Sequence, residues 1–473
     1  MHLDIKSYKK ILDWININPS LIFLILGLIF GIIFIFNLAP LNGTDEFTHF
    51  PRAYQISDGT FWETKLSQQQ YGGSLPSNIN NMINDYRDLS RKSTGQQFNS
   101  RENQLNSQYM SINNVGKNNS TAIFTSVVTY PPWAYIPNIA GIWLAKLFRL
   151  PLIWYVYLAR LIGLFVWIGL TYGAIRILPK GKWFLLTIAL LPTSLSQAAT
   201  VGADGLLNGL FWMLIALFIA VVTDKNKLTK FKLILIPLLS IFASVLKVGY
   251  WLIPMIFLTI PDSYFPTKTI SRIWKLILVV GTAVASILFA LHNVSSAAGV
   301  TLTPRAGNYI NSKAQISYVL HNPFIFIARV LVQPFTKNFD TIYLGVVGII
   351  TNRLIYLSIF VMMLLFLGLL LSFKNIPSLP AWVIYKKRFI AAASIIIIGT
   401  YGFLALAFYV GNTQVASTVV FGMYGRYFLP FLPLFIIFPL TTKRKNTFKY
   451  TYQSLGVLSI LTIGLVATVI SLG

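Results

Sequence analysis

The sequence predicts an all-α polytopic membrane protein, and three observations lead to this fold class. Hydrophobic residues make up 55% of the 473-residue chain and charged residues only 11%, a balance that excludes an ordinary soluble domain. Apolar runs long enough to cross a bilayer recur along the chain. Lys and Arg fall in short clusters between these runs, as the positive-inside rule expects of cytoplasmic loops.

The net charge of +25 is interpreted in the same way. A strongly basic chain can bind nucleic acid, but here the cations lie between apolar runs and not along one polar face. Contact of cytoplasmic loops with anionic lipid is therefore favoured over a nucleic-acid partner. The chain contains no Cys, which excludes a disulfide scaffold, a thiolate metal site and a cysteine nucleophile.

The first apolar run, Leu21 to Ala39, follows a basic N-terminal segment and is long enough to span a bilayer. Its length and the lack of a small-residue cleavage site favour a retained helix over a signal peptide. With the basic flank in the cytoplasm, residues 41–152 form the first extracytoplasmic loop, which holds seven of the 13 acidic residues. Two interfacial helices are expected in this loop, at Phe47 to Ile56 and at Tyr130 to Leu150.

The Tyr130 to Leu150 helix decides the topology. Ten further apolar runs follow it as candidate spans, at 153–177, 183–199, 205–222, 231–246, 249–261, 274–292, 354–373, 389–410, 427–440 and 453–471. With this helix interfacial, every basic cluster between the runs lies in the cytoplasm, whereas a full crossing would place all of them outside. The sequence therefore predicts about 11 transmembrane helices, with the N-terminus in the cytoplasm and the C-terminus outside.

The chain, 1–473, is accordingly expected to form a single integral membrane domain. A second extracytoplasmic loop is expected at 293–351, with another interfacial helix from Phe324 to Val332. The rare charges at the membrane edge all fall on the outer side in this topology. The site is therefore expected to be extracytoplasmic.

A polar stretch, NGTDEFTHFPRAYQISDG at 42–59, opens the first loop. Two adjacent carboxylates at a membrane edge cost desolvation unless a cation or a reacting proton meets them, which favours a functional site. Asp45 and Glu46 are therefore the predicted catalytic residues, and one of them would act as a general base toward an acceptor hydroxyl. The alternative is a cap pair at the start of an interfacial helix, where acids are favoured.

His49 and Arg52 are predicted substrate-binding residues. His49 lies one helical turn beyond Asp45, and Arg52 lies three residues further, so a helix would place all three on one face. The alternative is an ordinary surface face of an interfacial helix.

Four more predicted substrate-binding residues lie between apolar runs. Lys247, in SVLKVGYW, and Arg426 with its neighbour Tyr427, in MYGRYFLP, stand at helix ends among aromatic residues. Such cations could bind a phosphate at this depth, or extend to lipid headgroups. Asp204 is either the N-cap of the next helix or a ligand to substrate or metal. Two separated carboxylates are too few to assign a metal site, so no cofactor is predicted with certainty and a divalent metal stays an alternative.

Several of these motifs, in their order along the chain, resemble those of a bacterial family known as domain of unknown function 2142. Its members are membrane proteins placed in the GT-C glycosyltransferase superfamily. The motifs are GTDEFTHFPRAYQISDG, GGSLPSN, YPPWAYIPN, ADGLLN, LKVGYW and GRYFLPFLP, and the match runs from the first span to about Pro439.

The resemblance implies a GT-C fold, in which two juxtamembrane helices lie in the first extracytoplasmic loop and an acid follows the first span. It also implies a lipid-linked sugar donor that enters from the bilayer. Carried over by position, Asp45 would be the catalytic base with Glu46 as its neighbour. Charge and depth make Arg426 a plausible partner of the donor phosphate.

The function expected is that of an inverting glycosyltransferase, which moves a sugar from a polyprenyl-phosphate donor to a hydroxyl of a cell-surface glycan. The residues required are a base for the acceptor and cations for the phosphate. Two alternatives stay open, a transporter or flippase of a lipid-linked glycan and a polymerase or ligase of such glycans. The chain has no GxxxxGK[ST], HExxH or GxSxG motif, which argues against cytosolic nucleotide chemistry.

Overall fold

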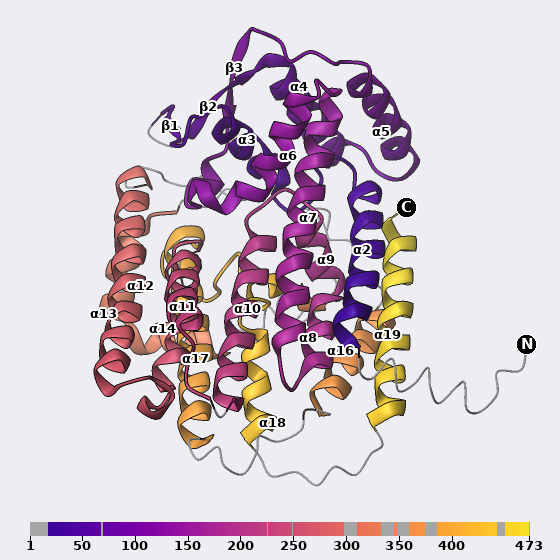
Figure 1. The fold of residues 1–473 in the computed structure, drawn as a ribbon. Coiled ribbons are helices and arrows are strands. Elements are labelled where there is room, and N and C mark those ends of the chain that lie inside the picture. The colour runs from indigo at the N-terminus through magenta and orange to yellow at the C-terminus, as the bar shows by residue number, and fades with distance from the viewer. Residues whose placement is uncertain are drawn as a thin grey trace, which may run out of the picture.

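The computed structural model describes residues 18–67, 70–224, 226–247, 249–297, 310–332, 345–347, 359–374, 376, 386–441 and 450–472. Within these ranges the chain is mostly helical, as predicted. A bundle of long helices carries a smaller layer, built from the first loop, at one end (Figure 1). This layer is called the first-loop layer below.

Five helices of the described residues are long and apolar enough to cross a membrane: α2 (Pro19–Asn37), α7 (Leu152–Ile177), α10 (Asp204–Thr223), α12 (Lys268–Ala297) and α17 (Lys386–Asn412). A sixth span results if α13 (Ser312–His321) and α14 (Pro323–Val332) count as one, although they are bent by 100°. The prediction of a helical protein with several membrane spans is thus confirmed. The α14 helix also lies where the sequence predicted a helix in the second loop.

Within the described residues, the other predicted crossings coincide with helices that are shorter than a span, broken, or described only in part. These are α8 (Lys182–Ala189), α9 (Pro192–Ala198), α11 (Lys230–Ser244), η3 (Tyr250–Thr259), α16 (Ile359–Lys374), η8 (Gly425–Phe428), η9 (Leu432–Ile436), α18 (Ile437–Thr441) and α19 (Tyr450–Leu472), together with the short turns η4 (Asp262–Tyr264) and α15 (Gly345–Val347). Proline explains one break. Leu191 is extended, with φ −61° and ψ 139°, because Pro192 disfavours a helical conformation in the residue before it. Among the described residues, length and composition therefore support five or six spans, and the number of eleven stays a prediction.

The first-loop layer contains both helices and strands. Its elements are α3 (Glu46–Ser57), β1 (Thr64–Lys65), β2 (Tyr71–Pro76), α4 (Ser77–Lys92), α5 (Gly95–Met110), β3 (Asn119–Ile123), η1 (Thr125–Val127), η2 (Pro132–Tyr135) and α6 (Ile136–Leu147). The three strands form an antiparallel sheet in the order β1-β2-β3. The all-helical prediction did not include this sheet. Gly72 permits the close pairing, since a Cβ there would lie 2.0 Å from the Ala122 carbonyl oxygen.

The two helices predicted in the first loop are present. α3 spans the predicted segment almost residue for residue, but its side chains are largely buried. α6 has 12 residues, fewer than the roughly 20 that a span needs. It folds back on α7 so closely that a Cβ at Gly141 would meet the Leu158 carbonyl oxygen at 2.2 Å.

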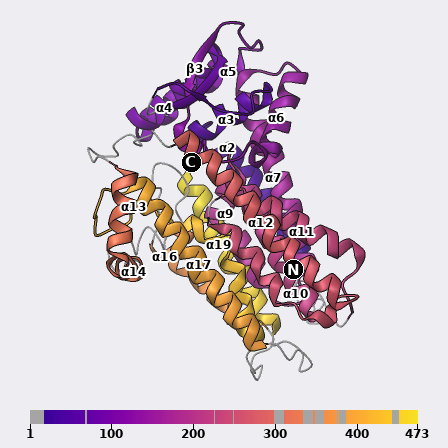
Figure 2. The same cartoon turned by 90° about the vertical axis from the view of Figure 1, so that its left-hand side faces the viewer.

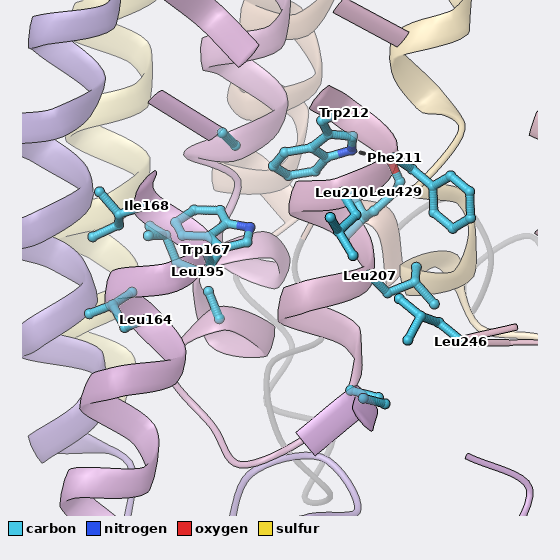
Figure 3. Close-up of a cluster of buried hydrophobic side chains, with 14 of the residues drawn as sticks. Leu164, Trp167, Ile168, Leu195, Leu207, Leu210, Phe211, Trp212, Leu246 and Leu429 are labelled. Atoms are coloured by element: carbon cyan, nitrogen blue, oxygen red, sulfur yellow. Dashed lines mark hydrogen bonds between the residues drawn. The ribbon is translucent and has the colours of Figure 1, made fainter. Parts of the chain in front are cut away.

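The core of the bundle lies where α2, α7 and α10 pack together. Trp167 of α7 makes edge-to-face contacts with Phe23 of α2 and with Trp212 of α10, at centroid distances of 5.5 and 6.0 Å. The Trp212 indole N–H donates to the Leu429 carbonyl oxygen at 2.8 Å (Figure 3). This bond fixes the segment that follows η8 against α10.

The first described helix starts at one end of the bundle, and the last described helix ends at the other. α2 starts at the end away from the first-loop layer (Figure 1), whereas the C-terminal end of α19 lies on the side of that layer in both views (Figures 1 and 2). A chain that starts at one end of a bundle and finishes at the other passes through it an odd number of times.

Candidate functional site

Asp45 stands at the turn that joins α2 to α3. Its backbone is left-handed, with φ 57° and ψ 11°, a conformation that Asp tolerates better than most residues. The Asp45 carbonyl oxygen accepts from the Thr48 and His49 N–H groups and so starts the helix. Its side chain makes no cap hydrogen bond. Instead, Oδ2 accepts from Nη2 of Arg426 at 2.8 Å, so the carboxylate faces a cation 381 residues away in the chain.

Glu46 points elsewhere and is fully buried. Arg160 of α7 donates to it through Nε at 2.8 Å and Nη2 at 2.5 Å, and both side chains have 0% exposure. The backbone N–H groups of Gly43 and Val201 also donate to the carboxylate, at 3.0 and 2.7 Å. Four hydrogen bonds thus satisfy this carboxylate, as a buried charge requires.

Arg160 is a residue that the sequence analysis missed. Its two terminal nitrogens also donate to the carbonyl oxygens of Ile35, Leu38 and Ala39 at 2.7–2.9 Å. These carbonyls belong to the end of α2 and the turn after it, where backbone oxygens lack helical partners. A signal was available, because a lone Arg inside the apolar run LIWYVYLARLIGLF must find partners within the protein.

Arg426, in η8, lies between two tyrosine rings. Its guanidinium carbon is 5.4 Å from the Tyr424 ring centroid and 5.0 Å from that of Tyr427, within cation–π range. Nη2 donates to the Tyr427 hydroxyl at 3.0 Å as well as to Asp45. Its Nε is buried and has no hydrogen-bond partner among the described residues. Arg426 is therefore only partly satisfied.

A second ion pair, between Lys247 and Asp204, lies beside the first. The Lys247 ammonium is 3.2 Å from Oδ1 of Asp204, which opens α10. The same ammonium lies over the rings of Tyr130 and Tyr427, at 5.2 and 4.3 Å. The Tyr427 ring thus contacts both Lys247 and Arg426, which brings the two ion pairs together. In the structure α10 begins at Asp204 and its N-cap residue is Ala203, whereas the capping alternative placed Asp204 itself at the N-cap.

His49 of α3 completes this group. Its Nδ1 shares a 2.8 Å hydrogen bond with the Tyr135 hydroxyl, and its ring packs edge-on against Tyr130. Burial lowers the pKa of His49 to about 4, although the negative charges of Asp45 and Asp204 oppose this shift. The imidazole is therefore neutral at physiological pH.

Arg52 does not join the group, although the helical spacing placed it on one face with His49. Its Nη1 donates to Gln55 at 2.6 Å, and its Nη2 donates to the Phe61 carbonyl oxygen at 2.8 Å and pairs with Glu63 at 3.3 Å. These bonds hold the segment after α3 against the helix. A substrate contact for Arg52 stays a prediction.

The structure brings together six of the eight predicted site residues and separates Glu46 and Arg52 from them. We call the following residues the charge cluster: Asp45, His49, Asp204, Lys247, Arg426 and Tyr427, with Tyr130 beside them. Two carboxylates and two cations balance within it. Among the described residues, no group of three or more His, Cys, Asp or Glu side chains is arranged to hold a metal ion. The cluster can bind an anion through its cations and accept a proton on a carboxylate.

Comparison with known proteins gives one finding. The model of the family described as "Predicted membrane protein (DUF2142)" matches residues 28–435. This match begins within α2 and covers the first-loop layer and the whole charge cluster. No curated protein and no solved structure matches the chain.

Proposed function

The chain belongs to the DUF2142 family of predicted membrane proteins, and from this premise we propose that it is an inverting glycosyltransferase of the GT-C type. Its donor is a sugar linked to a polyprenyl phosphate, and its acceptor is a hydroxyl of a cell-surface glycan. The reaction takes place at the outer face of the membrane, at the charge cluster.

One observation carries the proposal, the contact between Asp45 and Arg426. A carboxylate with 35% exposure stands 2.8 Å from a guanidinium with 11% exposure, next to the first-loop layer. The transfer needs a base for the acceptor hydroxyl and a cation for the leaving phosphate, close to one another. These are the two groups that meet here, and Lys247 adds a second cation.

The roles follow from the chemistry of the transfer. Asp45 takes the proton of the acceptor hydroxyl as its oxygen attacks the anomeric carbon of the sugar. Arg426 and Lys247 stabilise the negative charge that develops on the leaving phosphate. Tyr427 holds both cations in place through its ring. Neutral His49 offers hydrogen bonding to the sugars without adding charge.

Glu46 has a different role in this proposal. Its carboxylate accepts four hydrogen bonds from Arg160, Gly43 and Val201, all within the protein. It holds the turn in which Asp45 stands, and Asp45 alone is the base.

The proposed topology retains the eleven crossings and places the N-terminus in the cytoplasm. Six crossings that length alone does not support are then made by α8 with α9, α11, η3, α16, η9 with α18, and α19. The start of α2 and the end of α19, at opposite ends of the bundle, agree with an odd number of crossings. The basic clusters between the runs then face the cytoplasm.

Binding of polyprenyl phosphate to the purified protein tests the proposal. Arg426→Gln and Lys247→Gln should each weaken binding by about tenfold, because a charge-assisted contact to the phosphate is lost. Arg426→Lys should also weaken binding, since a compact ammonium replaces the planar guanidinium and its paired donors. Arg329→Gln is the matched control. Arg329 contacts Tyr409 and the carbonyl oxygens of Ala416 and Ser417, outside the cluster.

Unchanged affinity in all three cluster variants would remove the phosphate role. A loss of binding in the control as large as in the variants would attribute the effect to a general loss of folding.

A further inference from the structure

The two arginine–carboxylate pairs beside the first loop differ in how firmly they are made. Arg160 presents the edge formed by Nε and Nη2 to Glu46, and both nitrogens donate. Arg426 uses only Nη2 toward Asp45, and its Nε is buried without a partner among the described residues. The Arg160–Glu46 pair therefore uses both nitrogens of one guanidinium edge, whereas the Arg426–Asp45 pair uses only one of the two.

A guanidinium edge with one unused donor can bind a ligand that accepts from both of its nitrogens. A guanidinium edge matches the oxygens of a phosphate as well as those of a carboxylate. A phosphate at Arg426 could accept from Nε and Nη2 together, and so satisfy the buried Nε that Asp45 leaves unpaired. The buried, unpaired Nε carries a free-energy cost that such a ligand would remove.

We propose that the donor phosphate displaces Asp45 from Arg426, so that the base is released only when the donor is bound. This inference rests on the proposed function and adds an order of events to it. Before the donor binds, the oxygen that would accept the proton is held in the ion pair with Arg426. After the exchange, Arg426 binds the phosphate and the Asp45 carboxylate can turn toward an acceptor hydroxyl.

The charges of the cluster favour the same order. Asp45 and Asp204 balance Lys247 and Arg426 in the ligand-free protein. A phosphodiester donor adds one negative charge, which favours uptake of a proton by a nearby carboxylate. Donor binding thus makes Asp45 a better proton acceptor at the moment when one is needed.

The transfer step balances on these groups. The acceptor oxygen forms a bond to the anomeric carbon, and the bond between that carbon and the phosphate oxygen breaks. The electron pair of the broken bond leaves with the polyprenyl phosphate, which Arg426 and Lys247 hold. The hydroxyl proton passes to the Asp45 carboxylate.

A double-mutant cycle on the purified full chain tests the exchange, with polyprenyl phosphate as the probe. Asp45→Asn and Asp45→Ala should bind the probe about tenfold more tightly than the wild type, because the competitor for Arg426 is removed. In the Arg426→Gln background, the same substitutions should leave the affinity unchanged. Simple repulsion between Asp45 and the phosphate predicts instead that the gain persists without Arg426, so additivity of the two changes would overturn the exchange.

Controls separate this failure from that of the proposed function. Asp58→Asn removes a carboxylate that pairs with Lys146 in the same loop, and it should not change the affinity. Binding that depends on Arg426 but does not change when Asp45 is substituted would contradict the exchange and leave the phosphate role of Arg426 intact. If the wild type shows no saturable binding, both the exchange and the proposed function are contradicted. Inorganic phosphate and phosphatidylglycerol vesicles serve as competitors. An equal cycle measured with phosphatidylglycerol would identify an ordinary lipid headgroup as the ligand and overturn the proposal that the donor releases Asp45.

Discussion

Asp45 and Glu46 are neighbours in the chain, yet their carboxylates bind different arginines on different elements. Glu46 turns inward to Arg160 of α7, with no exposure on either side chain. Asp45 turns outward to Arg426 of η8. The backbone of Asp45 is left-handed at this position, where the side chains of Asp45 and Glu46 diverge. Glu46 therefore builds the turn, and Asp45 is the acid that we propose as the base.

Glu46→Gln should reduce stability strongly. The change leaves the Arg160 charge buried without its counter-ion, and breaking such a pair costs roughly 3 to 5 kcal/mol. Thermal unfolding of the purified protein in detergent measures the effect. Asp45→Asn serves as the matched control, because its pair is partly exposed and should cost far less. A Glu46→Gln protein with wild-type stability and no transferase activity would contradict this division of roles.

Acidification should destabilise the protein through His49. The pKa of His49 is about 4 in the folded protein and 6.5 in the unfolded chain, because burial disfavours the charged form. The unfolded state therefore binds more protons between these values, so this contribution to stability is complete above pH 6.5 and lost as the pH falls toward 4. At about 1.4 kcal/mol per pKa unit, the loss amounts to about 3 kcal/mol.

Unfolding measured at several pH values in the wild type and in His49→Gln checks this expectation. The variant cannot be protonated at this position, so its stability should fall less over the same range. Parallel curves for the two proteins would show that another group titrates.

The proposed topology predicts which positions an impermeant thiol reagent can reach. The natural chain has no cysteine, so each introduced cysteine is the only target. A cysteine at Asn103, exposed in α5, should react in intact cells, whereas one at Lys230, exposed at the start of α11, should react only after permeabilisation. Labelling of the Lys230 variant in intact cells would reverse the assignment of sides.

The sequence predicted those parts of the fold that depend on local pattern. The first apolar helix, α3, α6 and α14 all lie where the sequence predicted helices. The sheet was not predictable in this way, because β2 reads YGGSLP and lacks alternation of apolar and polar residues. Its pairing depends on Gly72 and on a strand almost fifty residues later.

The site was predictable as a set of residue types but not as an arrangement. The scarcity of acids and the cations at helix ends identified Asp45, Asp204, Lys247 and Arg426. Sequence alone could not tell Asp45 from Glu46, because the groups that bind Glu46 most firmly lie 114 and 155 residues away. Tyr130 was likewise visible only as part of YPPWAYIPN, and its position over Lys247 follows from the tertiary fold.

The rate of sugar transfer by Asp45→Asn tests the central claim most directly. Asn keeps the size of the side chain but accepts no proton, so the purified variant should fold and bind polyprenyl phosphate while transferring sugar about 10² to 10⁴ times more slowly. Asp58→Asn, the same chemical change in the same loop, should transfer at nearly the wild-type rate. Wild-type transfer by a stable Asp45→Asn protein would contradict the assignment of Asp45 as the catalytic base.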